Sequence, residues 1–121
     1  MSGVEKDLTF VLKYYQGDKF VAWLRRARDT MLGSGHDLVM AISGTDNVYS
    51  AERVLRAAEA AGLIERGSYA PSVEMQFFGV GGLSGKDHAK QPESERSKTT
   101  FNWTVTDKGR EFLRERDTVK V

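Results

Sequence analysis

The sequence predicts one α+β domain in which several short helices, a β-hairpin and a closing helix share a single core. Its 121 residues are enough for one such core and are close to the usual size of a domain. Apolar residues recur at helical spacing as far as Gly62, and apolar and polar residues alternate strictly at 100–106. No internal repeat divides the chain, so we expect residues 1–121 to form one domain, with 1–17 as an N-terminal extension.

Two helices are expected in the N-terminal third of the chain. Residues 8–15 fit a helix and a strand equally well, because Leu8 and Leu12 belong to both periods, and we favour a short helix. Residues 19–32 carry a single apolar stripe, and Asp18 is expected to cap this helix. The stripe consists of Phe20, Leu24, Ala27 and Met31.

A helix, a turn and another helix follow. Residues 36–43 are largely apolar and predict a short buried helix. Residues 44–47 have turn chemistry, and Ser50 then caps a third helix that Gly62 ends. The inner face of this third helix is expected to consist of Ala51, Val54, Leu55 and Ala58. The outer face is expected to consist of Ser50, Arg53, Ala57 and Ala60, with Arg56 on its flank.

The remaining chain predicts a hairpin and a closing helix. Residues 69–78 are strand-like, and the alternation at 100–106 is typical of a half-buried strand. The glycine-, serine- and lysine-rich segment 79–99 between them is expected to be a long, mobile loop. A last helix is expected at 108–116, with Phe112 turned inward. The residue that caps it is Thr106 or Asp107.

Two stretches resemble winged helix-turn-helix regulators of the MarR and PadR type. Residues 50–66 pass through glycine, leucine and isoleucine at 62–64, like the family's third helix where it leads into the first wing strand. Residues 103–113 resemble the second wing strand followed by threonine, a polar pair, glycine and an amphipathic helix. The resemblance covers about residues 36–113. It implies an α+β winged helix-turn-helix fold: a three-helix core with a β-hairpin wing at 69–106 and a C-terminal helix.

The resemblance also implies a function. Such proteins place the third helix, here residues 50–61, in the major groove of duplex DNA, which accepts one α-helix. Arg53 and Arg56 would reach guanine edges or phosphates there. The expected DNA-binding residues are Asn47, Tyr49, Ser50, Arg53, Arg56, Lys86, Lys90, Arg96 and Lys98, the last four as phosphate partners in the wing. We therefore expect a sequence-specific, double-stranded-DNA-binding transcriptional regulator.

The charge of the chain is modest for a DNA-binding protein. The net charge is only +1, and no run of basic residues is present. On the third helix, Glu52 and Glu59 offset the two arginines. A homodimer would double the contacts with DNA, and we expect one built from the N-terminal segment and the last helix. The aromatic residues open to a core or a dimer-interface interpretation are Tyr14, Tyr15 and Trp23.

Other interpretations remain open. Arg53 and Arg56 are also spaced to pair with Glu52 or Glu59 as solvated helix residues. The same fold would then serve as a protein-binding module without DNA binding, because fold does not fix function. A third interpretation is an enzyme that uses the glycine-rich loop to bind a nucleotide.

Several kinds of site are not expected. Residues 79–87 lack the spacing of a phosphate-binding loop, because Asp87 follows Lys86 where serine or threonine is needed. His36 and His88 are far apart and have no paired ligands nearby, so no metal site is expected. We therefore expect a protein that is not an enzyme and that uses no cofactor, nucleotide or metal.

The chain also lacks the features of secreted and membrane proteins. It has no cysteine, no apolar run of membrane-spanning length and no N-terminus of the secretory type. These observations predict a cytoplasmic protein without a membrane partner.

Overall fold

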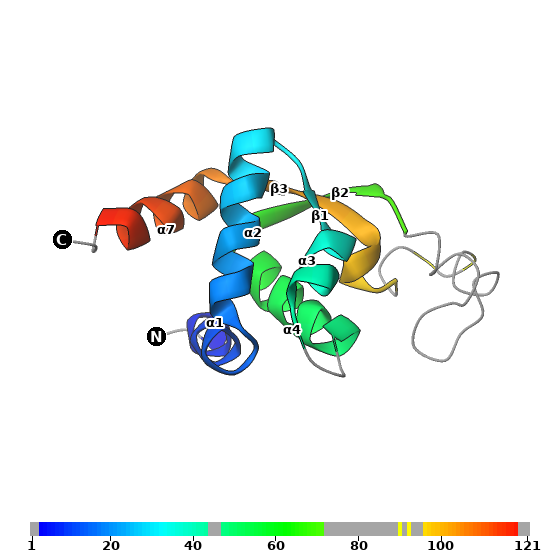
Figure 1. Cartoon of the computed structure of the whole chain (residues 1–121), viewed down its shortest axis with the longest axis horizontal. Coiled ribbons are helices and arrows are strands. Elements are labelled where there is room, and N and C mark those ends of the chain that lie inside the picture. The colour runs from blue at the N-terminus through cyan, green and yellow to red at the C-terminus, as the bar shows by residue number, and fades with distance from the viewer. Residues whose placement is uncertain (1–2, 44–46, 72–89, 91, 93–95, 119–121) are drawn as a thin grey trace.

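The computed structural model describes residues 3–43, 47–71, 90, 92 and 96–118 (Figure 1). Within them the protein is α+β, with five α-helices and one three-stranded antiparallel sheet, which confirms the predicted class. The helices are α1 (Gly3–Tyr14), α2 (Gly17–Thr30), α3 (Gly35–Ala41), α4 (Asn47–Ala60) and α7 (Asp107–Thr118). The strands are β1 (Gly33–Ser34), β2 (Ile64–Tyr69) and β3 (Phe101–Val105), and a 3-10 turn, η2 (Lys98–Thr100), precedes β3.

β3 is the central strand of the sheet, with β1 on one side and β2 on the other. Gly33 of β1 lies opposite Trp103, and the register of β2 shifts between Arg66 and Tyr69. The sequence analysis did not predict β1, because a strand of two residues is too short to show an alternating pattern.

The core lies between the sheet and helices α2, α3 and α4. Two tryptophans are its largest side chains: Trp23 of α2 and Trp103 of β3, both almost completely buried. Their indole N–H groups donate to backbone oxygens, Trp23 to Ser34 at 2.8 Å and Trp103 to Lys98 at 3.0 Å. Both buried polar groups are thus satisfied. Trp23 is therefore a core residue.

Two of the predicted helix caps are wrong. α4 begins at Asn47, so Ser50 lies inside the helix and does not cap it. α2 begins at Gly17, so Asp18 lies in its first turn, and the cap position is Gln16, which makes no side-chain cap hydrogen bond. The N–H groups of a first turn need no partner within the helix, so glycine and asparagine are tolerated there. Gly17 and Asn47, which the sequence pattern placed in a break and a turn between helices, are the first residues of α2 and α4.

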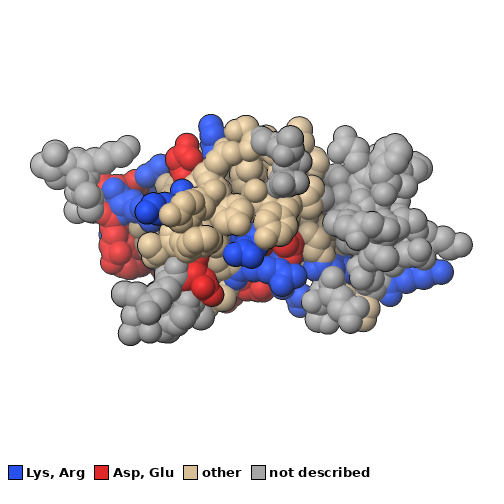
Figure 2. All heavy atoms as spheres, turned by 90° about the horizontal axis from the view of Figure 1, so that it is seen from below, with Lys and Arg blue, Asp and Glu red and all other residues tan. Residues whose placement is uncertain are grey.

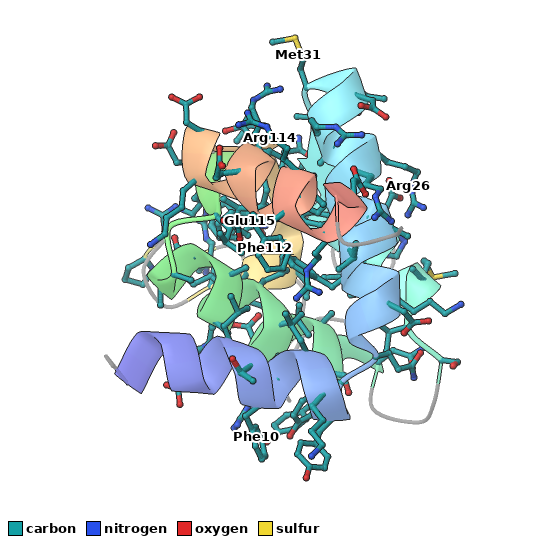
Figure 3. All side chains as sticks on the ribbon, turned by 90° about the vertical axis from the view of Figure 1, so that its left-hand side faces the viewer. Phe10, Arg26, Met31, Phe112, Arg114 and Glu115 are labelled. Atoms are coloured by element: carbon teal, nitrogen blue, oxygen red, sulfur yellow. The ribbon has the colours of Figure 1, made fainter. Side chains whose placement is uncertain are left out.

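Two methionines expected in the interior are exposed. Met31 is 72% exposed because α2 ends at Thr30, and the left-handed backbone of Met31 (φ 63°) turns it out of the apolar stripe. Figure 3 shows Met31 at this end of α2, pointing away from the protein. Met40 of α3 is 69% exposed, although its neighbours Leu38 and Val39 are buried as predicted.

The first strand of the hairpin lies earlier than predicted. β2 covers Ile64–Tyr69, whereas the sequence pattern predicted a strand at 69–78. Residues 65–68 are polar or glycine and are exposed, so no alternation of apolar residues marks this strand. Residues 72–78, like most of the predicted loop 79–99, lie outside the described residues.

β3 and α7 agree closely with the prediction, with Phe101 and Trp103 buried. Thr106 is the cap of α7, because its Oγ1 accepts a hydrogen bond from the N–H of Gly109 at 3.0 Å. The same hydroxyl donates to the backbone oxygen of Gly62 at 2.5 Å. One side chain therefore links the start of α7 to the end of α4.

Replacing Thr106 by alanine should lower the free energy of unfolding by about 1–2 kcal/mol, because it removes both hydrogen bonds at this junction. Thr106→Ser keeps the hydroxyl and should lose less than half as much. Urea unfolding followed by circular dichroism measures both variants. Equal losses would show that the methyl group, and not the hydroxyl, stabilises the junction.

Candidate nucleic-acid interface

α4 turns one side into the core and the other toward solvent. The buried residues include Ala51, Val54, Leu55 and Ala58, as predicted. The solvent side carries Tyr49, Arg53, Arg56 and Ala60, which we call the outer face of α4. Ala57, expected among the outer residues, is only 7% exposed because α1 packs along that side of α4. Seen from below, where α1 and α4 lie, basic side chains gather at the edge of a large uncharged area (Figure 2).

Arg53 is held by aromatic rings. Its guanidinium carbon lies 5.6 Å from the ring centre of Tyr15 and 5.9 Å from that of Tyr49. An N–H group of Arg53 also donates to the Tyr49 hydroxyl at 3.4 Å. Cation–π contacts at exposed sites are worth only about 0.5–1 kcal/mol. Arg53 is therefore oriented by these rings but can exchange them for a stronger anionic partner.

Arg56 pairs with Glu52 one helical turn earlier, as one of the open interpretations expected. The Arg56 Nε lies 2.8 Å from Glu52 Oε1, while 66% of the arginine side chain remains exposed. Exposed pairs of this spacing contribute roughly 0.3–0.5 kcal/mol. Such a pair leaves most of the guanidinium accessible to an incoming anion.

The two glutamates of α4 bind the residues at the start of η2, just before β3. Glu52 Oε2 accepts hydrogen bonds from the Ser97 hydroxyl at 2.7 Å and from the backbone N–H of Lys98 at 2.6 Å. Glu59 pairs with the Lys98 ammonium at 2.9 Å, and the Lys98 side chain is only 16% exposed. These carboxylates therefore fasten η2 to α4, and Glu52 at the same time pairs with Arg56 on the outer face.

Glu52→Ala should lower the free energy of unfolding by about 2–3 kcal/mol, because a half-buried carboxylate that accepts three hydrogen bonds is lost. Glu65→Ala is the matched control, since Glu65 lies exposed on β2 and should change stability by less than about 0.5 kcal/mol. Chemical unfolding of both variants gives the comparison. Equal stabilities would contradict the fastening role of Glu52.

The other predicted residues are spread over several environments. Asn47 begins α4, and its Oδ1 is buried without a hydrogen-bond partner in the part of the chain that the structure describes. Ser50 is half-buried. Arg96 lies over the ring of Tyr69, at 4.1 Å from its centre. Two loop lysines were also predicted, and they differ: Lys90 is exposed, and Lys86 lies outside the described residues. The structure thus brings Tyr49 and Arg53 into contact and joins Arg56 and Lys98 through the Glu52 carboxylate, with the Lys98 ammonium engaged by Glu59.

A groove between α1 and α4 is the feature that the sequence analysis missed. It encloses about 700 Å³. The residues that line it are Asp7, Phe10 and Val11 of α1 and Tyr49, Glu52, Arg53, Arg56, Ala57 and Ala60 of α4. The N-terminal segment was assigned to a dimer interface, and only its apolar stripe at helical spacing indicated that it needs a partner within the fold.

Three large aromatic side chains are exposed where α1 meets α4. Phe10 is 49%, Tyr14 61% and Tyr49 54% exposed. Phe10 packs against Tyr14 with ring centres 4.7 Å apart, and Lys13 lies 5.4 Å from the centre of the Tyr14 ring. Figure 3 shows Phe10 pointing away from the protein below α1. Exposed aromatic rings interleaved with cations favour a macromolecular partner on this face.

Among the described residues, no group of three or more histidine, cysteine, aspartate or glutamate side chains is arranged to hold a metal ion. None of the described helices has both the length and the hydropathy that a membrane crossing requires. No protein-family model matches the chain, and no curated protein or solved structure gives a significant match.

Proposed function

We propose that this protein is a winged helix-turn-helix regulator that binds duplex DNA. In this proposal α2, α3 and α4 form the three-helix core, β2 and β3 are the strands of the wing, and α4 enters the major groove. The observation that carries it is the element order together with the exposed arginines of α4. Helices α1, α2 and α3 precede α4, the antiparallel strands β2 and β3 follow it, and arginines stand on its outer face.

The charge distribution on α4 supports the same function. Glu52 and Glu59 offset the arginines in the sequence, but their carboxylates bind η2 and Lys98. The Arg56 side chain is 66% exposed, against 17% for Glu52 and 34% for Glu59, so it is more accessible to an approaching phosphate than either glutamate. A net charge of only +1 is compatible with DNA binding when the basic groups stand on one face.

A polarisation titration with a labelled mixed-sequence duplex tests the proposal. If two arginines neutralise two phosphates, the affinity should fall roughly tenfold between about 50 and 200 mM salt. Circular dichroism checks that the protein is folded. If the folded protein does not bind the duplex at about 50 mM salt, the proposal of DNA binding is wrong. The regulatory role and the homodimer belong to the same proposal, and size-exclusion chromatography with light scattering tests the dimer.

A winged-helix module that binds protein is the second candidate. The exposed aromatic side chains of Phe10, Tyr14 and Tyr49 favour it, because aromatic residues are enriched at protein interfaces. The double variant Arg53→Ala with Arg56→Ala separates the two candidates. If the protein binds DNA, the double variant has a lower affinity for the duplex than the unmodified protein. If it is a protein-binding module, the unmodified protein already shows no salt-sensitive binding to the duplex.

A further inference from the structure

The position of α1 conflicts with insertion of α4 into DNA. The two helices pack side by side at the lower face of the protein, and Figures 1 and 3 show α1 at that face next to α4. A helix with its side chains is about 10–12 Å wide, so the pair is roughly 20 Å across. The major groove is only about 12 Å wide and accepts one helix. In this arrangement α4 cannot enter the groove to its full depth.

Apolar contacts with α4 and α2 hold α1 in place. Val11 is 3% exposed, and Leu8, Leu12 and Tyr15 are half-buried against the core. The Tyr15 ring, just after α1, lies against Arg53 of the outer face. The groove beside Val11 shows that the two helices are not closely packed along their whole length. Separating α1 would expose one core side chain and three half-buried ones, while the rest of the core could stay packed.

The junction between α1 and α2 has the properties of a hinge. Gln16 has a left-handed backbone (φ 57°, ψ 57°), which is unfavourable for a residue with a side chain. Its side chain holds the end of α3: the amide group donates to the Ser43 backbone oxygen at 2.5 Å and accepts from the Ser43 N–H at 3.2 Å. The direction of α1 thus depends on the strained backbone of Gln16 and its hydrogen bonds to Ser43, together with the apolar contacts of α1.

We propose that α1 is a hinged cover of the outer face of α4, and that DNA binding requires it to swing away about Gln16. This inference rests on the proposed function. The closed form hides one flank of α4, engages Arg53 with Tyr15 and places the Asp7 carboxylate in the groove, where it repels phosphate. The apparent dissociation constant is then the intrinsic constant divided by the fraction of open molecules.

A disulfide across the groove tests the cover directly. The chain has no cysteine, so Val11→Cys combined with Ala57→Cys introduces the only two thiols, at buried positions on opposite walls of the groove. The oxidised variant should bind a mixed-sequence duplex at least tenfold more weakly than the same protein after reduction. The single variants Val11→Cys and Ala57→Cys, treated in the same way, control for the substitutions and for the reductant.

A second pair of variants tests whether loosening α1 strengthens DNA binding, and it needs no disulfide. Tyr15→Ala removes the ring that meets Arg53, which should loosen α1 and tighten DNA binding several-fold. Tyr14→Ala is the matched control, because Tyr14 is 61% exposed and its ring contacts lie within α1, to Phe10 and Lys13. Thermal unfolding confirms that each variant is folded.

The outcomes separate the cover from the proposed function. Weaker binding by the oxidised form, or tighter binding by Tyr15→Ala than by Tyr14→Ala, supports the cover. Equal affinity of the oxidised and reduced forms overturns it while leaving DNA binding intact. If the disulfide does not form, equal affinity of the two tyrosine variants overturns it. Absence of binding by every form, Tyr15→Ala included, overturns the proposed function and the cover together.

Discussion

Replacing both Arg53 and Arg56 by alanine should weaken binding to duplex DNA by about two orders of magnitude. Each arginine contact with a base edge or phosphate is worth roughly 1–3 kcal/mol, and 1.4 kcal/mol is tenfold in affinity. Neither arginine is buried, and their partners in the protein are aromatic rings and the half-buried carboxylate of Glu52. The variant should therefore fold normally, and a polarisation titration at constant salt gives the loss in affinity.

The control must change the net charge by the same amount. Arg26→Ala combined with Arg114→Ala also removes two positive charges, from exposed positions on α2 and α7 (Figure 3). This variant should lose less than threefold in affinity, through the weaker long-range field alone. Equal losses in the two double variants would mean that α4 has no special part in binding.

Trp103→Ala should have the largest effect on stability, about 3–5 kcal/mol. Trp103 is fully buried at the centre of β3, where β1 and β2 pair on either side, and its indole N–H bonds to Lys98. The change leaves a cavity and an unpaired carbonyl at the same place. Because domains of this size are stable by only about 5–15 kcal/mol, part of the sample should unfold at 37 °C.

Two further variants test whether the stability loss of Trp103→Ala comes from the cavity and the lost hydrogen bond in the core. Trp103→Phe keeps most of the volume and removes the N–H group, so it should cost less than Trp103→Ala. Met40→Ala should change stability by less than about 0.5 kcal/mol, because Met40 is 69% exposed. Urea unfolding ranks the three variants. A loss for Met40→Ala as large as that for Trp103→Ala would contradict the location of the core.

Strong periodic patterns gave correct predictions. The stripe from Phe20 to Ala27 predicted α2, and the alternation from Phe101 to Val105 predicted β3. These patterns work because one buried face imposes its own period on the sequence. β1 and β2 carry almost no apolar residues, so nothing in their sequences marked the strands, and the pairing with β3 defines them.

The candidate site could be predicted only in part. Arg53 and Arg56 lie on the exposed side of α4, as their spacing indicated. Counting charges along the helix did not show that Glu52 and Glu59 bind residues about 40 positions later in the chain. The sequence could not predict that α1 packs against α4 either. An amphipathic stripe indicates that a helix needs an apolar partner, but it does not identify that partner.

An NMR titration of the isotopically labelled protein with a mixed-sequence duplex tests the central claim most directly, and a 13.5 kDa chain suits the method. We predict the largest changes in amide shifts at Tyr49, Arg53 and Arg56 on α4, with further changes along α1 as it leaves its closed position. Residues of α7 should change little. Shift changes confined to α7 or to the end of α2 near Met31 would contradict the claim that α4 binds DNA.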